Sequence, residues 1–401
     1  MRPVSAQDPR PLFMDEARAL LLARLSPLPA ESLALTSALA GRVAASDLRA
    51  AHDLPPFDNS AMDGFAVRAE DAREVLPVVG GSYAGDDPAK LAPHTAMTVA
   101  TGAPLPPGAD AVVPIERAHA DGERVSFTGP VTVGDHVRRR GTDVASGAVI
   151  VAAGSPLRPL ALAAIATGGV AELACHRRPR VCVVVTGDEL VAPGEPLRHG
   201  QIHESNSILI AARCEQAGAQ IVSIERVRDD AEATRATLEG ALAAADVVVT
   251  SGGVSVGTRD HVKPALAALG VEQLFWRIAV QPGRPTWCGL REGKVVVGLP
   301  GNPLSVMVGL ELLLVPALRR LAGAAEPGPA VSRLPLTTAL RRDVDRQRVR
   351  PVRLVAAGAE PLGADLSHQL GRAAIADALA LVPSGSGELA GGSPVDLVDL
   401  R

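Results

Sequence analysis

Residues 246–257 read DVVVTSGGVSVG, and this stretch decides the fold of the chain. The apolar, β-branched run at 246–250 predicts a buried strand, and a helix is expected near 261–269. Glycines between a strand and a helix let backbone N–H groups approach an anion closely, and the helix N-terminus favours negative charge. The segment therefore predicts a phosphate-binding loop, with an ordinary tight turn as the alternative.

Strands and helices alternate on both sides of this loop. Such alternation is typical of a parallel sheet with helices on both faces, in which ligands bind at the carboxyl ends of the strands. Asn302 caps one of the helices, and Pro303 begins it. The expected strands are 180–186, 220–227, 246–250 and 294–298, and the expected helices are 207–216, 231–245 and 261–269.

Carboxylates follow these strands, beside the glycine-rich loop. Glu189 lies in TGDEL, Asp229 in RDD, and Asp260 just after the loop. Carboxylates beside a phosphate repel it, and a divalent cation removes that conflict. The alternative is that the aspartates cap helices and Glu189 is solvated.

The segments on either side of this α/β region differ from it in residue pattern. Helices are expected at 14–25, at 32–43 and at 157–167, and short strands between Gly and Pro residues predict a β-rich domain over 46–144. After the Gly/Ala/Pro linker 322–329, short strands predict a small β domain.

Two polar stretches of the β-rich segment could carry function. Residues 55–66 read PPFDNSAMDGFA, and residues 138–143 read RRRGTD. Polar loops on a rigid domain often carry function, and arginine suits phosphate and oxyanions. Asp63 could equally be a turn residue, and the arginines could be a solvated charge run.

Composition limits the function classes. The 401 residues imply two to four domains, and 47% apolar residues with a net charge of −4 exclude a disordered chain. An acidic, aromatic-poor chain argues against nucleic-acid binding. The four cysteines are far apart, which argues against a zinc site or a disulfide framework. With no secretory signal or membrane span apparent, we expect a cytoplasmic protein.

Six motifs in order carry a family resemblance. They are FDNSAMDG (57–64), TGAP (101–104), RRRGTD (138–143), TGDEL (186–190), SGGVSVG (251–257) and GLPGNPLS (298–305). Together they resemble the molybdopterin molybdenumtransferase family, which includes the gephyrin E-domain and its bacterial relatives. The resemblance covers roughly residues 20–318.

The resemblance implies molybdenum cofactor biosynthesis: insertion of molybdate into adenylylated molybdopterin, with magnesium-dependent release of AMP. It implies a multi-domain fold of α/β plus β type. It also implies a homodimer with shared active sites, and as partners a molybdopterin adenylyltransferase and molybdoenzymes. The implied parts are a helical rod (1–46 with 145–178), an inserted β-rich domain (47–144), an α/β parallel-sheet molybdopterin-binding domain (179–323) and a C-terminal β-barrel-like domain (330–401).

The resemblance also assigns site residues by motif. The acids with catalytic roles are Asp63, Asp143, Glu189, Asp229 and Asp260, of which Glu189, Asp229 and Asp260 are also the expected magnesium ligands. The expected substrate-binding residues are Thr101, Arg138, Thr186, Gly187, Ser251, Gly252, Gly253, Ser255, Lys263, Arg277, Gln281, Arg284, Pro300, Gly301, Asn302 and Ser305.

Departures from the family pattern keep two alternatives open. The family usually has KPGKP where this chain has QPGRP at 281–285, so Gln281 removes a positive charge. In the last domain Gly371-Arg372 replaces a serine pair, and Arg372 could restore the charge. The alternatives are a paralogue that binds molybdopterin or a partner protein without turnover, and a molybdopterin adenylyltransferase.

Overall fold

The chain folds into two compact units. The computed structural model describes residues 11–254, 260–363 and 368–401. Unit 1 comprises Met1–Glu31, Gly41–Ala45 and Cys175–Arg401, and unit 2 comprises Ser32–Ala40 and Ser46–Ala174. Strand β1 (Ala30–Ala34) pairs with β12 (Glu172–His176), and the boundary between the units falls within these two strands.

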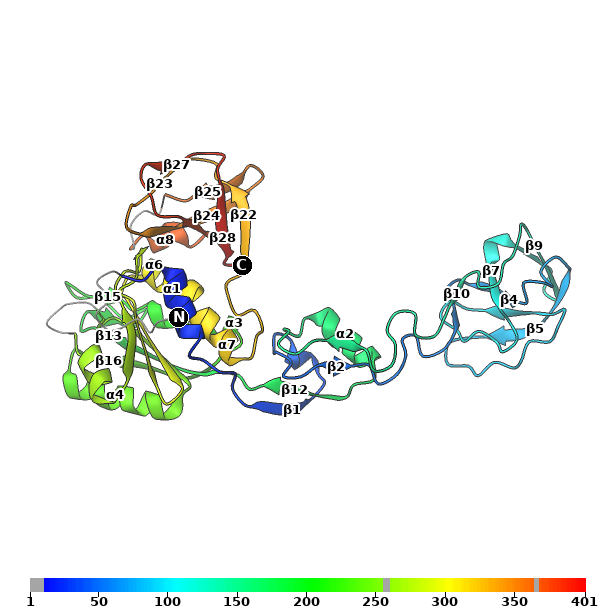
Figure 1. Ribbon diagram of the computed structural model, residues 1–401, viewed down its shortest axis with the longest axis horizontal. Helices are drawn as coiled ribbons and strands as arrows, with labels where there is room; N and C mark the ends of the chain where they lie inside the picture. Colours follow the sequence, from blue (N-terminus) through cyan, green and yellow to red (C-terminus); the bar gives the residue numbers. More distant parts are fainter. Residues whose placement is uncertain (1–10, 255–259, 364–367) are drawn as a thin grey trace. The chain divides into compact units, whose positions relative to one another are not determined.

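Unit 1 is built on a six-stranded sheet (Figure 1). In spatial order its strands are β16 (Gln220–Val227), β13 (Arg180–Thr186), β17 (Val247–Ser251), β21 (Lys294–Leu299), β20 (Trp287–Arg291) and β18 (Glu272–Trp276). The four strands predicted from the sequence are confirmed, and they pair in parallel.

The sheet is nevertheless mixed, which corrects the expectation of a parallel sheet. Strands β20 and β18 continue it in antiparallel pairing. Glu292 and Gly293 alone join β20 to β21, with φ angles of 51° and 79°. A two-residue loop with positive φ at both positions is the turn of a tight hairpin, which requires antiparallel strands.

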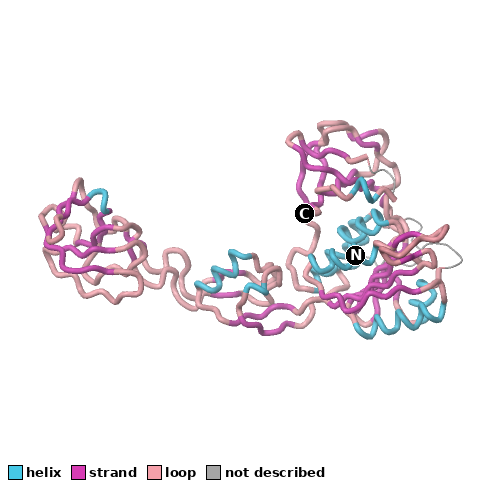
Figure 2. The backbone as a smooth tube through the Cα atoms, turned by 180° about the vertical axis from the view of Figure 1, so that it is seen from behind, coloured by secondary structure: helices cyan, strands magenta, loops and turns pink. Residues whose placement is uncertain are grey.

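Helices cover both faces of this sheet, as expected (Figure 2). Along β13, Val181, Val183 and Val185 share one core with helices α1, α3, α6 and α7, whereas Cys182 and Val184 pack with α4 and α5. Successive side chains along a strand point to opposite faces of the sheet, so the strands contribute to two hydrophobic cores, one on each face. The bounds are α1 (Met14–Leu22), α3 (Asn206–Gln216), α4 (Ala231–Ala244), α5 (Val262–Ala268), α6 (Pro303–Gly309) and α7 (Val315–Leu321), with a π-helical turn η3 (Leu310–Leu314) between α6 and α7.

The C-terminal part of unit 1 forms a second six-stranded sheet. Its path is β19 (Val280–Gln281), β24 (Gln347–Val355), β26 (Ala378–Val382), β28 (Pro394–Asp399) and β22 (Val331–Pro335), and β25 (Gly358–Pro361) also pairs with β24. A parallel bridge between Leu336 and Ala359 links the end of β22 to β25. Strand β19 joins this sheet to the α/β part, because it pairs in parallel with β24. A short helix, α8 (Leu370–Ala373), precedes β26.

Unit 2 holds a third six-stranded sheet around a small apolar core that includes Phe65, Val67 and Leu76. Its order is β7 (Ala111–Pro114), β4 (Gly64–Val67), β6 (Ala96–Val99), β5 (Leu76–Ser82), β9 (Arg124–Phe127) and β8 (Ala118–Ala120). Strands of two or three residues extend the unit: β3 (Asn59–Ser60) pairs with β10 (Val137–Arg138), and β2 (Leu48–Arg49) pairs with β11 (Val149–Val151).

One of the three helices expected in the flanking segments does not form. Residues 32–43 form no helix: β1 and the 3-10 turn η1 (Ser37–Leu39) occupy them, because pairing with β12 overrides the helix propensity of Ala and Leu. Helix α1 packs in the core of unit 1 through Met14, Ala17 and Leu21, which lie on one helix face. Helix α2 (Pro159–Thr167) lies in unit 2, and α1 and α2 confirm the helices expected at 14–25 and 157–167. The described residues of 1–46 and 145–178 contain strands as well as these helices.

None of the helices in the described residues has the length and apolar character required to cross a membrane.

Candidate functional site

The parallel strands of unit 1 end beside one another. Strand register pairs Thr186 with Val227, and it pairs Ser251 with both Val185 and Leu299. The loops that follow these residues therefore meet at one sheet edge, where ligands bind in α/β folds.

Ser251 belongs to a buried hydrogen-bond network at this edge. Asn206, the first residue of α3, donates its Nδ2 hydrogens to Ser251 Oγ (2.9 Å) and to the Gly301 carbonyl (2.7 Å). Ser251 Oγ in turn lies 3.4 Å from the Pro300 carbonyl. The network ties the loop after β17 to the loop after β21, and it unites three residues that the sequence assigned to the site.

Asn206 belongs to this network, although the sequence analysis did not assign it to the site. The Gly301 oxygen can only accept a hydrogen bond, so the amide orientation is fixed and Asn206 Oδ1 points elsewhere. That oxygen is buried and has no hydrogen-bond partner. Buried polar atoms are usually satisfied, so Oδ1 is an acceptor available for a ligand.

The glycines after Ser251 are required by their surroundings. Gly252 and Gly253 have φ angles of 87° and 66°. A Cβ on Gly252 would lie 2.6 Å from the Thr186 carbonyl oxygen. The Gly252 N–H donates to the Leu299 carbonyl (3.1 Å), so this amide serves the sheet rather than an anion. Ser255 lies outside the described residues.

Three carboxylates lie after β13 and β16. Thr186 Oγ1 donates to Asp229 Oδ1 (3.1 Å), and the Asp229 N–H donates to Asp188 Oδ1 (3.3 Å). The exposed Glu189 bends back over Gly187, where a Cβ would lie 2.5 Å from its Oε2. The expected magnesium ligands Glu189, Asp229 and Asp260 do not converge within 4.8 Å of one another.

Asp260, Lys263 and Arg277 belong to a second cluster beside the loop. Lys263 Nζ lies 3.9 Å from Asp260 Oδ2, whose side chain is 7% exposed. Both Lys263 (3.7 Å) and Arg277 (4.3 Å) contact the ring of Trp276, whose Nε1 donates to the Val254 carbonyl (3.1 Å). Trp276 was missed, although it is one of only two tryptophans in the chain and precedes Arg277.

Gln281 and Arg284 lie at the junction with the C-terminal sheet. Gln281 is half-buried in β19, and its register partner in β24 is Arg348. Arg284 is exposed, and its carbonyl accepts the Ile278 N–H (2.9 Å). Arg372 lies on α8, and its Nη1 donates to the Gly363 carbonyl (3.4 Å). The cross-strand neighbour of Gln281 is thus a positively charged residue, Arg348.

Asp63 and Thr101 meet in unit 2. The Thr101 N–H (2.7 Å) and Oγ1 (3.0 Å) both donate to Asp63 Oδ1. These bonds, the backbone one first, lower the pKa of the exposed Asp63 below its ordinary value. A Cβ on Gly64 would overlap the Val113 carbonyl in β7, so the Asp-Gly pair also has a structural reason.

The arginine run of unit 2 is mostly paired. Arg139 Nη1 donates to Asp58 (2.7 Å), and Arg140 Nε donates to Asp53 (2.6 Å). The Arg140 N–H and then Arg139 lower the pKa of Asp58 against the opposing effect of burial. These ion pairs hold the segment 138–143 against the segment that contains Asp53 and Asp58. Arg138 is exposed on β10 opposite Asn59, and the exposed Asp143 donates its N–H to the Leu54 carbonyl (2.9 Å).

A cavity of about 250 Å³ lies beside α3 and β16. Its lining includes Val185, Ile208, Ile224 and Arg226, with the buried Glu204 hydrogen-bonded to Ser207. None of the residues assigned from the sequence lines this cavity, so it is separate from the network at Ser251.

Comparison with family models defines the class of protein. Residues 12–169 match the MoeA N-terminal region (domain I and II). Residues 182–320 match the family described as "Probable molybdopterin binding domain", and residues 333–400 match the MoeA C-terminal region (domain IV). The order and extent of these matches correspond to a multi-domain α/β plus β protein with a pterin-binding domain in the middle.

Curated relatives and solved structures agree with this class. Molybdopterin molybdenumtransferase 2 of Mycobacterium tuberculosis is 39% identical over 377 residues, covering 90% of this chain and 93% of the relative. The molybdopterin molybdenumtransferase of Haemophilus influenzae is 37% identical, covering 78% of each chain. A crystal structure of a molybdopterin biosynthesis MoeA protein from Pyrococcus horikoshii is 30% identical, with a TM-score of 0.80 and coverage of 98% and 100%. The chain belongs to the molybdopterin molybdenumtransferase (MoeA) family.

Proposed function

We propose that this chain is an enzyme of molybdenum cofactor biosynthesis that inserts molybdate into adenylylated molybdopterin and releases AMP. The observation that carries the proposal is the network of Asn206, Ser251 and Gly301 beside the Thr186–Asp229 pair. It places amide, hydroxyl and carboxylate groups at the carboxyl edge of a parallel sheet. The buried Asn206 Oδ1 can accept a hydrogen bond from a pterin N–H.

Different residues are proposed to bind different parts of the substrate. Lys263 and Arg277 both lie against Trp276, and they offer cations to a phosphate or to molybdate. The amide of Gly253 and the loop Pro300–Ser305 hold the pterin and its phosphate. In the proposed step an oxygen of water or of molybdate attacks the molybdopterin phosphorus of the anhydride. Its new bond forms as the bond from that phosphorus to the bridging oxygen breaks, and AMP leaves with the bridging oxygen and its electron pair. Groups that stabilise this charge accelerate the cleavage.

The carboxylates fit magnesium as a proposed cofactor. Mg²⁺ commonly binds through one or two carboxylates plus substrate phosphates and keeps several waters, so a preformed three-carboxylate cage is not required. Glu189 and Asp229 follow adjacent strands and offer oxygen ligands only, and Asp229 is oriented by Thr186. Bound there, magnesium would offset the charge that builds on the phosphates.

The experiment that tests the proposal is direct. Purified protein given magnesium, molybdate and adenylylated molybdopterin should release AMP, measured by chromatography. Absence of AMP at every molybdate concentration would contradict the proposal. Pterin binding without turnover, seen by calorimetry, would favour a non-catalytic paralogue, and ATP-dependent adenylylation of molybdopterin would favour an adenylyltransferase. A cytoplasmic location remains a prediction.

The remaining site residues are proposed to act across a homodimer. In this arrangement Asp63, Thr101, Arg138 and Asp143 of one copy complete the site of the α/β part of the other. The exposed Asp63–Thr101 pair is suited to this role, because the lowered pKa of Asp63 keeps its carboxylate ionised and the side chain is accessible to another molecule. A molybdopterin adenylyltransferase and molybdoenzymes are proposed as the protein partners.

Mixing two inactive variants should restore activity if sites are shared. Asp63→Asn and Asp229→Asn homodimers are each expected to be inactive. Refolded or co-expressed together, half the dimers should be mixed, and each mixed dimer should have one intact site. We expect about a quarter of the wild-type AMP release. Activity no higher than in the separate variants would place both residues in a site made by one chain.

Gln281→Lys tests the departure from the family pattern. Lysine adds a charged donor, so the KM for molybdate should fall about tenfold, which corresponds to about 1.4 kcal/mol. The gain should not be larger, because Arg348 already lies opposite position 281. The measurement is AMP release against molybdate concentration, with Gln220→Lys at the exposed start of β16 as the control of equal charge. An unchanged KM would show that position 281 does not contact the oxyanion.

A further inference from the structure

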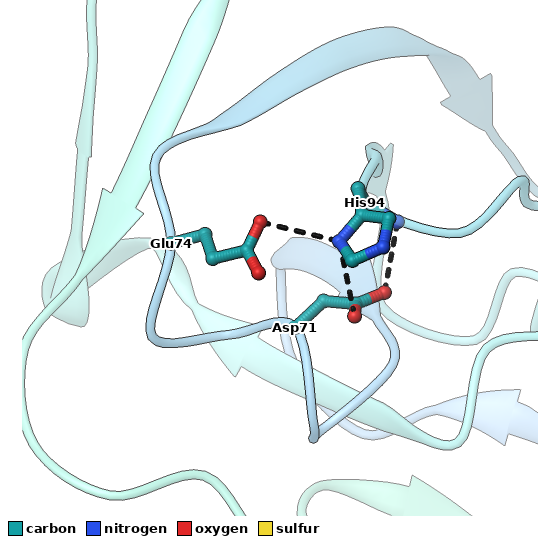
Figure 3. A group of neighbouring side chains, drawn as sticks. All are labelled: Asp71, Glu74 and His94. Atoms are coloured by element: carbon teal, nitrogen blue, oxygen red, sulfur yellow. Dashed lines mark hydrogen bonds and ion pairs between the residues drawn. The ribbon is translucent and has the colours of Figure 1, made fainter.

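Three potential metal ligands converge in unit 2, and none of them is a residue proposed for molybdate transfer. Asp71 and Glu74 lie in the turn after β4, and His94 lies in the loop that precedes β6 (Figure 3). One ligand atom from each lies within 4.8 Å of the other two, and no other such group occurs in the part of the chain that the structure describes.

His94 Nδ1 lies at the centre of the group. It is 3.2 Å from Glu74 Oε2 and 3.4 Å from Asp71 Oδ1, so both carboxylates point at the same ring nitrogen. The other oxygen of Asp71 is occupied, because it accepts the His94 N–H at 2.9 Å. The Asp71 side chain is only 6% exposed, whereas Glu74 and His94 are open to solvent.

Hydrogen bonding accounts only partly for this arrangement. A ring nitrogen carries at most one hydrogen, so an Nδ1–H would have to be shared between the two carboxylates in a weaker, three-centre bond. The two carboxylates then lie close together with a single proton between them and the ring. A cation between the three atoms would satisfy all of them, with Nδ1 as a lone-pair ligand and the remaining proton on Nε2.

The distances match the size of a zinc site. Zn–N and Zn–O bonds of about 2.0–2.2 Å in a tetrahedron place ligand atoms about 3.4 Å apart. The two distances to Nδ1 are 3.4 and 3.2 Å. Imidazole with carboxylates is a ligand set that suits Zn²⁺ and similar transition metals better than magnesium. Arg68 Nε, 4.0 Å from Asp71 Oδ2, is the neighbouring cation and faces the oxygen that the metal does not use.

We propose that Asp71, Glu74 and His94 bind a divalent transition-metal ion, with water completing its coordination. The ion would fasten the loop between β5 and β6 to the turn after β4. Because two of the three ligands are exposed, ion binding would require little rearrangement of the folded apo-protein. For the same reason the bound ion would exchange with ions in solution.

The test uses the full chain after chelator treatment. Zn²⁺ is titrated by calorimetry, and Co²⁺ is titrated with its visible absorption as the spectroscopic reporter. The wild type should bind one ion that His94→Gln and Glu74→Gln do not bind, or bind with a Kd at least about tenfold higher. The cobalt band that arises from imidazole and carboxylate ligation should be lost in both variants.

Matched controls come from the same unit. His119→Gln on β8 and Glu123→Gln, both exposed, should leave the number of bound ions and the Kd unchanged. Since all four positions are exposed, circular dichroism should show intact folding in every variant. The same stoichiometry and Kd in the wild type and His94→Gln would overturn the proposal. So would binding that appears only at millimolar ion. AMP release is a separate readout, so failure here leaves the proposed function standing.

Discussion

Glu311→Gln should lower the free energy of unfolding by about 3 kcal/mol, the usual cost of breaking a buried ion pair. Glu311 is 2% exposed in η3, and its two carboxylate oxygens accept Nε and Nη2 of Arg213 in α3. Burial, and then the charge of Arg213, already lower the pKa of the nearby Arg319. Without Glu311, two partly buried arginines would face each other with no carboxylate between them. Urea unfolding followed by circular dichroism measures the loss.

Two comparisons isolate the effect of burial. Glu239→Gln removes an exposed partner of Arg235 on α4, and about 0.5 kcal/mol is expected there. The double variant Glu311→Leu with Arg213→Leu should recover more than half of the loss, because no charge is left unpaired. A loss in Glu311→Gln no greater than in Glu239→Gln would show that the pair contributes nothing beyond a surface contact.

The parallel core was predictable because it depends on local pattern. Uninterrupted apolar runs gave β13, β17 and β21, since strands buried on both faces read as continuous hydrophobic stretches. The edge strand β16, QIVSIERV, is mixed in polarity and largely accessible to solvent, but its β-branched residues still predict a strand. The antiparallel strands β18 and β20 were missed. Their sequences, EQLFW and WCGLR, lack both a long apolar run and strict alternation. The pairing of β20 with β21 is set by the Glu292-Gly293 turn, and β18 then pairs with the free edge of β20.

The sequence predicted which loops form the candidate site, but it did not predict most of the side-chain contacts within it. Motifs located Ser251, Asp229 and Thr186, because glycine and acidic residues directly follow strands. Asn206 was not assigned to the site, because it lies outside the six motifs and its contacts reach Ser251 and Gly301, which are 45 and 95 positions away in the sequence. The pairing of Arg139 with Asp58 joins residues 81 positions apart. No local pattern contains such a contact, and the Asp71–Glu74–His94 group depends on loop packing in the same way.

Asp63→Asn should reduce the rate of AMP release about a hundredfold or more, the range associated with loss of a positioned acid–base group. The bonds from Thr101 keep the pKa of Asp63 below its usual value, so the carboxylate is ionised at neutral pH. Asp63 can therefore act as a base or as a negative charge, but not as an acid. Half-protonation of Asp63, and the loss of activity that follows from it, should therefore occur at a lower pH than for an ordinary aspartate.

Folding should survive the change. Asparagine retains an oxygen that can accept both Thr101 bonds, and the side chain is exposed, so Tm should change by less than about 2 °C. Asp121→Asn is the matched control: it is an exposed aspartate of unit 2 whose pKa is likewise lowered by N–H donors, from Arg124 first and then Glu123. It should retain full activity. If Asp63→Asn instead unfolds the protein, or if both variants turn over normally, Asp63 is a structural turn residue and the shared site lacks its proposed carboxylate.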